Sequence, residues 1–184
     1  MRTVAVGALY ERSVARTLGA YQFSLRARGG PHDGGVDLVG MWQLRASSVP
    51  VLVQCKRTQR RVGPRDVREL EGVVMRRSTG TLGLLVSSSG FTRYGLEAAM
   101  RASVPLVLAT MPMDVPTSSE HHDHACEGRE AGVPPDERAH TPTLASFVVN
   151  GNAWRNLPSL RIATDAGGNL VLRDGVDALG PPRH

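Results

Sequence analysis

The sequence predicts an α/β protein with a central mixed sheet and helices on both faces. Three observations favour this fold class. Within residues 1–112, three consecutive strand-length apolar runs follow a first helical pattern, and further strands then alternate with helices. Sheets of this mixed kind are covered by helices on both sides. The 184 residues are enough for one such domain with a sizeable core, and two full domains are not expected.

The first helix and the first three strands are predicted within residues 10–56. One helical face is formed by apolar residues at i, i+4, i+8 and i+11, and Gly19 lies where that helix would end; the four are Tyr10, Val14, Leu18 and Tyr21. Residues 23–28, 36–42 and 49–56 are expected to be strands, with a glycine-rich turn at 29–35.

The next helices and strands alternate. An amphipathic helix is predicted from its apolar positions Val67, Leu70, Val73 and Val74, and its other sides are strongly basic. Residues 81–87 form an apolar run of strand length. Thr92 is expected to cap a helix that runs through Met100, and residues 104–109 form another short strand.

The chain is expected to have three parts. Residues 1–112 form the folded core. Residues 113–143 are rich in Ser, His, Glu, Gly and Pro and are predicted to be a disordered linker or insertion. Residues 144–184 form a C-terminal extension of short strands, with Asn150-Gly151 read as a turn. This extension either adds edge strands to the core or forms a small cap.

The charge is distributed unevenly between these parts. Residues 1–112 carry 16 Arg and Lys against 7 Asp and Glu, net +9, whereas residues 113–184 carry 6 against 10, net −4. Such an excess on one compact unit favours a polyanionic partner, although a solvated basic surface is the alternative. No apolar run approaches the roughly 20 residues of a membrane span, so no membrane partner is expected. The two distant cysteines do not form a disulfide framework.

One lysine stands among 21 arginines, and it lies beside a candidate metal site. Lys56 and Gln54 point to one side of a predicted strand, Asp37 emerges from the neighbouring strand, and Glu11 reaches over the sheet from the first helix. Carboxylate and amide oxygens of this kind suit Mg²⁺ or Mn²⁺. An amine beside such an ion is the combination of groups that hydrolysis of a phosphodiester requires.

Each of these residue types has a chemical reason to be there. A divalent ion held by Asp37 and Gln54, with support from Glu11, would polarise the scissile phosphate and activate a water molecule. Lys56 would orient or deprotonate that water, or stabilise the pentavalent phosphorus. Nucleic-acid contacts are expected from Arg57, Arg60, Arg61, Arg65 and, at a helix N-terminus, Thr92. Plain helix capping explains Thr92 equally well.

Four segments resemble the Mrr-type restriction endonucleases of the PD-(D/E)xK nuclease superfamily over roughly residues 7–110. They are Leu9-Tyr10-Glu11-Arg12, the run from Gly29 to Leu38, Val53-Gln54-Cys55-Lys56-Arg57 and Gly90-Phe91-Thr92. Arg68-Glu69-Leu70-Glu71-Gly72 and the run Leu82–Ser87 are similar to fungal mitochondrial proteins of the required-for-respiratory-growth type.

The resemblance implies a restriction-endonuclease-like α/β/α sandwich. It implies that Asp37 is the catalytic aspartate, that Gln54 holds the position many relatives fill with Glu, that Lys56 is the catalytic lysine and that Glu11 supports them. Gln at that position is usual for Mrr-like members. The resemblance also implies a location in mitochondria, whereas the first ten residues give weak support for a presequence, with Arg2 their single basic residue.

Three functions remain open. The leading hypothesis is a Mg²⁺- or Mn²⁺-dependent DNA endonuclease for mitochondrial genome maintenance. A homodimer is possible, and no small-molecule substrate is expected. The second is a catalytically inactive module that binds nucleic acid through the same basic core. The third is a structural or assembly protein that has inherited the fold.

Overall fold

The fold was analysed in a computed structural model that describes residues 2–28, 34–113 and 143–180. Its elements, in chain order, are α1 (Arg2–Gly19), β1 (Phe23–Ala27), β2 (Leu38–Leu44), β3 (Ser47–Lys56), α2 (Pro64–Val74), β4 (Leu82–Ser87), α3 (Arg93–Arg101), β5 (Leu106–Thr110), β6 (Ser146–Val149), α4 (Gly151–Trp154), β7 (Leu160–Thr164), β8 (Leu170–Asp174) and β9 (Asp177–Leu179).

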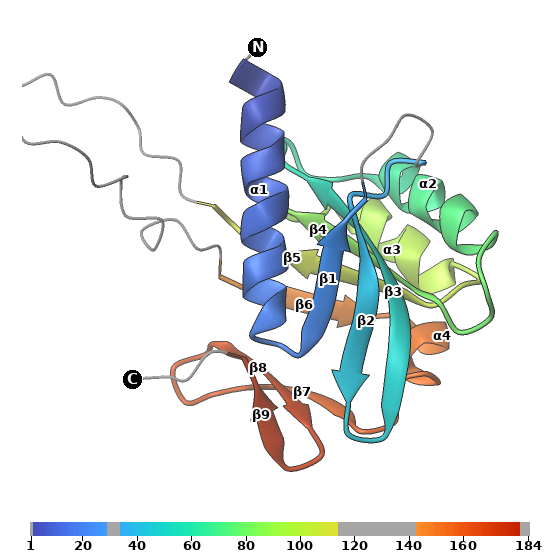
Figure 1. The fold of residues 1–184 in the computed structure, drawn as a ribbon, viewed down its shortest axis with the longest axis vertical. Coiled ribbons are helices and arrows are strands. Elements are labelled where there is room, and N and C mark those ends of the chain that lie inside the picture. Colours follow the sequence, from blue (N-terminus) through green and yellow to red (C-terminus); the bar gives the residue numbers. More distant parts are fainter. Residues whose placement is uncertain (1, 29–33, 114–142, 181–184) are drawn as a thin grey trace, which may run out of the picture.

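Six strands form a mixed sheet in the order β1-β2-β3-β4-β5-β6 (Figure 1). β1, β2 and β3 pair antiparallel, and a two-residue turn connects β2 to β3. β3, β4 and β5 pair parallel, because α2 and α3 make the crossovers between them. β6 returns antiparallel to β5. The predicted central mixed sheet is confirmed.

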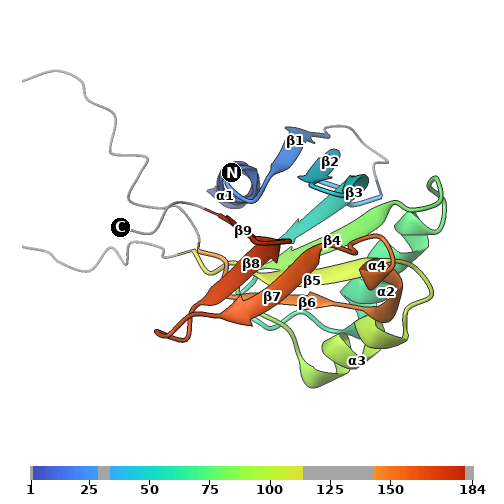
Figure 2. The same ribbon diagram turned by 90° about the horizontal axis from the view of Figure 1, so that it is seen from below.

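Two buried clusters cover the two faces of this sheet. Alternation along β3 sends Val51 and Val53 into a cluster with α1, and it sends Leu52 into a cluster with α2 and α3. Figure 2 shows α1 on one side of the sheet and α2 with α3 on the other. The predicted α/β/α sandwich is therefore confirmed. We call the two sides the α1 face and the α2 face.

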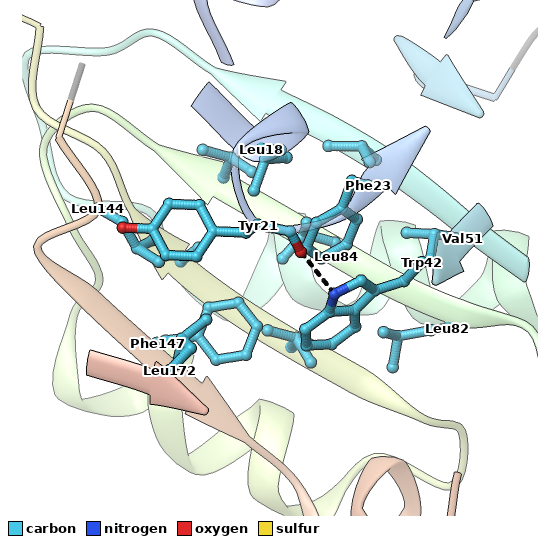
Figure 3. Packing of buried hydrophobic residues seen from close by; sticks show 14 of the residues in the cluster. Leu18, Tyr21, Phe23, Trp42, Val51, Leu82, Leu84, Leu144, Phe147 and Leu172 are labelled. Atoms are coloured by element: carbon cyan, nitrogen blue, oxygen red, sulfur yellow. Dashed lines mark hydrogen bonds between the residues drawn. The ribbon is translucent and has the colours of Figure 1, made fainter. Parts of the chain in front are cut away.

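Trp42 lies at the centre of the cluster on the α1 face. Its ring stacks on Phe23, with ring centroids 4.4 Å apart, and meets Phe147 edge to face at 5.8 Å. Its indole N–H donates to the carbonyl of Tyr21 at 2.9 Å, so this buried polar group is paired (Figure 3). Residues from β1, β2 and β6 are thus joined in one core.

The C-terminal residues provide both of the arrangements that the sequence left open. β6 is an edge strand of the main sheet, whereas β7, β8 and β9 form a separate three-stranded antiparallel sheet. Leu160 and Leu172 from the small sheet are fully buried in the cluster on the α1 face. The linker predicted at 113–143 lies, apart from its two end residues, outside the described residues.

The turn predicted at Asn150-Gly151 is wrong, because Asn150 is the N-cap of the short helix α4, which begins at Gly151. Its side chain is 1% exposed and makes four hydrogen bonds. The carbonyl oxygen accepts from the N–H groups of Leu106 and Ala153, and the amide nitrogen donates to the carbonyls of Ala99 and Val104. This one amide fastens α3, β5 and α4 together. No helix in the described residues is long and apolar enough to cross a membrane.

Candidate active site

The candidate catalytic residues gather where β2 begins and β3 ends. Asp37 immediately precedes β2, while Gln54 and Lys56 close β3. Leu38 pairs with Val53 in the antiparallel ladder, so Asp37 lies beside the last residues of β3. The sheet register therefore brings together the three residues that the sequence predicted to be neighbours.

Asp37 is fixed by hydrogen bonds on three sides. Its backbone N–H donates to the carbonyl of Val53 at 2.9 Å, and its own carbonyl accepts from the N–H of Arg28 at 2.8 Å. The carboxylate oxygen Oδ2 accepts from the backbone N–H of Cys55 at 2.6 Å. The carboxylate thus continues the pairing of β3 at the point where β2 has ended. Charge-assisted bonds of this kind are short and hold the carboxylate in place.

Gln54 is buried under the glycine-rich turn before Asp37. Its side chain is 4% exposed, and its carbonyl oxygen Oε1 has no hydrogen-bond partner among the described residues. Gly35 passes directly over it with φ of 77°, and a Cβ added there would lie 2.7 Å from Nε2 of Gln54. The turn needs glycine at this position for both its backbone angle and its close approach.

This pair of residues fits a divalent cation. A buried amide oxygen without a partner costs about 1–3 kcal/mol unless something outside the described chain satisfies it. Mg²⁺ and Mn²⁺ prefer carboxylate, carbonyl and water oxygens and are often held by only one or two carboxylates. Asp37 and Gln54 supply such oxygens. No group of three or more His, Cys, Asp and Glu within the described residues could hold a metal ion.

Lys56 is held by α2. Its ammonium lies 3.0 Å from Oδ1 of Asp66 and 3.6 Å from Oε2 of Glu69, and its side chain is 24% exposed. The sequence reasoning missed both carboxylates. Asp66 and Glu69 are three residues apart on the helix that follows β3, which is the spacing of neighbours on one helical face. That spacing was the available signal, but it did not show that this face meets Lys56.

Glu11 is on α1, on the face of the sheet opposite to Gln54 and Lys56, so the fold does not gather it with them. Cys55 packs against the cluster on the α1 face, opposite to its neighbours Gln54 and Lys56. Burial raises the pKa of the Cys55 thiol well above its ordinary value of 9.0, and the negative charges of Asp37 and Glu11 raise it further. Both carboxylates therefore favour the neutral form of this partly buried thiol.

Tyr10, the residue before Glu11, anchors α1 over this region. Its hydroxyl donates to the carbonyl of Met111 at 3.0 Å, and burial raises its pKa above the ordinary range. The positive charge of Arg57 acts in the opposite direction on that pKa.

The other predicted nucleic-acid contacts flank the site. Arg57, Arg60, Arg61 and Arg65 are all exposed, in the segment that leads from β3 into the first turn of α2. Thr92 precedes α3, and its hydroxyl oxygen accepts from the N–H of Gly95 at 3.0 Å. The capping interaction expected of Thr92 is thus present.

The comparisons with known proteins match the same part of the chain. Residues 7–112 match the family model of the Mrr catalytic domain, described as a restriction endonuclease. An uncharacterized mitochondrial protein of Schizosaccharomyces pombe (strain 972) is 39% identical over 115 residues, which cover 61% of this chain and 47% of that relative. The chain thus spans about half the length of this relative.

Among solved structures, a similar one is the MspJI restriction endonuclease in complex with a 27-mer oligonucleotide. It is 27% identical, with a TM-score of 0.43, over 58% of this chain and 25% of that one.

Proposed function

The chain belongs to the Mrr-type restriction endonuclease family, as its motifs predicted, and we propose that it is a metal-dependent endonuclease that hydrolyses phosphodiester bonds in DNA. Asp37 and Gln54 are its proposed metal ligands, Lys56 is the catalytic amine and Glu11 supports them. The observation that carries this proposal is Oε1 of Gln54, a buried oxygen without a partner among the described residues, next to the fixed carboxylate of Asp37.

The residues have separate roles in the proposed reaction. A bound Mg²⁺ or Mn²⁺ would supply charge neutralisation at the scissile phosphate and a more acidic water. Asp37 and Gln54 would hold that ion, because the β3 backbone fixes the carboxylate of Asp37 and the buried Oε1 of Gln54 has no other partner among the described residues. Lys56 donates a hydrogen bond to the attacking water or to a phosphate oxygen.

Asp66 and Glu69 keep the ammonium of Lys56 near the end of β3 before substrate arrives. Both pairs are partly open to solvent, so each contributes little to stability, on the order of 1 kcal/mol or less. Lys56 can exchange this weak partnership for a phosphate. Glu11 adds negative charge from the α1 side and raises the affinity for a cation.

A second candidate function is a nucleic-acid-binding module without catalysis. The observation that favours it is the engagement of Lys56 by two carboxylates of α2, which leaves its ammonium neutralised in this arrangement. A module of this kind keeps the basic surface but does not catalyse hydrolysis. It predicts nucleic-acid binding that weakens with salt and no metal-dependent cleavage.

We propose a mitochondrial location for the protein and a role in maintenance of the mitochondrial genome. The similarity to a fungal protein named as mitochondrial supports the location. Dimerisation, which would let two sites cut both strands, is a further part of this proposal and is tested by sedimentation of the protein with and without DNA.

The proposed function is tested with labelled duplex DNA, the wild-type protein and Asp37→Asn. Cleavage is measured in Mg²⁺ and Mn²⁺, and binding is measured in EDTA. The proposal expects metal-dependent cleavage that the variant loses by at least about 100-fold, because a neutral amide replaces the charged ligand. Binding without cleavage by both proteins would favour the second candidate instead.

A further inference from the structure

We propose that a groove on the α2 face, next to the candidate active site, binds the sugar-phosphate backbone of the DNA strand that leads away from the scissile phosphate. This inference rests on the proposed function and names the path of its substrate. The groove encloses about 460 Å³ between β1, β2, β3 and the turn that follows α2. The residues that line it include Arg26, Arg28 and Arg77 on the walls and Val39, Met41 and Leu52 on the floor.

The register of the sheet makes this groove one continuous surface. Arg26 pairs with Val39, and Val39 pairs with Leu52, so the three residues form a row across three strands. Paired residues project to the same side of a sheet, and Leu52 belongs to the cluster on the α2 face. The row therefore faces α2 and not α1.

The groove leads directly into the candidate active site. Gln54 lies two residues beyond Leu52 on β3 and so projects to the same face. On the other side of the groove, the N–H of Arg28 donates to the carbonyl of Asp37 at 2.8 Å. A strand lying in the groove would thus run towards the row of the sheet that holds both proposed metal ligands, Asp37 and Gln54.

The charge of the groove fits a polyanion. Its walls carry three guanidinium groups, and none of the described residues that line it is acidic. Within the described part of the chain, none of these three arginines has an ion-pair partner, whereas Lys56 has two. Uncompensated guanidinium groups in a concave surface attract and hold phosphate groups.

The floor of the groove fits sugars better than bases. Val39 and Met41 are half-buried and can contact the C–H groups of deoxyribose, and Leu52 is buried beneath them. None of the described residues that line the groove is aromatic. Without rings, the groove lacks the stacking platform of single-strand-binding proteins. Contacts to phosphate and sugar position a strand without reading its sequence. Binding in the groove is therefore expected to tolerate any sequence.

The test measures DNA binding in EDTA, so that cleavage does not interfere. The full chain, Arg26→Ala, Arg77→Ala and the double variant are titrated with a short fluorescein-labelled duplex between about 50 and 200 mM NaCl. Arg173→Ala is the matched control, because Arg173 is exposed on β8, whose neighbour Leu172 packs against the opposite face. Melting curves check that every variant is folded.

The groove predicts a smaller salt dependence for the variants. The slope of log affinity against log salt should fall by about 0.9 for each arginine removed, and Arg173→Ala should match the wild type. Equal slopes and affinities in all proteins would overturn the proposal that the groove binds DNA. Competition by free deoxynucleoside monophosphate at the same nucleotide concentration as DNA would also overturn it, because it would indicate a site for a small anion.

The groove and the proposed function can fail separately. Weakened binding by the arginine variants, with no cleavage by the wild type in Mg²⁺, would support the groove and reject the nuclease. Metal-dependent cleavage by all the proteins, with unchanged binding, would support the nuclease and reject the groove.

Discussion

Gly35 is the residue that most tightly constrains the candidate site, because it lies against Gln54. We predict that Gly35→Ala destabilises the protein by roughly 1–2 kcal/mol from its positive φ and also displaces the amide of Gln54. Gly168→Ala is the matched control, since φ is 79° there and an added Cβ would meet nothing within 4 Å. Thermal unfolding and DNA cleavage are measured for both variants.

Both glycine variants should lose similar stability, and Gly35→Ala alone should lose cleavage or metal affinity. Equal activity of the two variants, once both are folded, would show that the contact between Gly35 and Gln54 does not matter for the site.

Cys55 gives a prediction for the effect of pH. Burial raises the pKa of its thiol in the folded protein, so folding favours the neutral form. The resulting stabilisation is present below the ordinary value of 9.0 and is lost as pH rises above it. In a Cys126→Ser background, a thiol reagent at pH 8 should react with the partly buried Cys55 much more slowly in the folded protein than after unfolding. Rapid reaction of the folded protein would contradict this burial.

The sequence predicted the positions of some of the residues of the candidate site. Alternation along β3 was enough to put Gln54 and Lys56 on one side, and the order of strands was enough to bring Asp37 beside them. The ion pairs of Lys56 with Asp66 and Glu69 were missed, because they depend on how α2 lies against the end of β3. A helical pattern gives the face of a helix but not the strand residue that this face meets.

At the scale of elements, Asn150 connects α3, β5 and α4 through its buried amide. We predict that Asn150→Ala lowers the free energy of unfolding by at least about 3 kcal/mol, because it leaves four backbone groups without that partner. Asn152→Ala removes one hydrogen bond, to Ala102, and should cost about 1 kcal/mol. Urea unfolding measures both, and equal losses would contradict the role of Asn150.

The helices and central strands followed from local patterns, whereas Asn150 did not. Apolar runs such as Leu82–Ser87 are buried on both faces and were recognisable from composition alone. Asn-Gly is a common turn signal, so Asn150 was expected in a hairpin. Its amide is instead used as a helix cap whose partners lie up to 51 residues away in sequence, and no local pattern records such partners.

At the scale of the whole molecule, the folded core extends beyond the family match at residues 7–112. β6 completes the main sheet, and Phe147, Leu157 and Leu160 are buried in the cluster on the α1 face. We predict that a chain ending at residue 112 loses cooperative thermal unfolding, since each of these side chains contributes about 1.5–3 kcal/mol. A chain ending at residue 180 is the control. Equal melting curves would show that the C-terminal strands are dispensable.

The arrangement of the C-terminal strands could not be predicted from the sequence. Phe147 and Leu172 were recognisable as strand residues, but two different sheets were compatible with their pattern. Both occur, and long-range contacts fix which strand goes where: β6 pairs with β5, and the small sheet packs through Leu160 and Leu172.

The proposed metal-dependent hydrolysis at the end of β3 is tested by the nicking of supercoiled plasmid. Wild-type protein and Lys56→Ala are incubated with plasmid in Mg²⁺, Mn²⁺ or EDTA. Lys56→Ala should stay folded, because the ion pairs it removes contribute about 1 kcal/mol or less. We expect nicking by the wild type in either metal, none in EDTA and none by the variant. Equal nicking by both proteins, or retarded but uncut plasmid with both, would contradict this proposal.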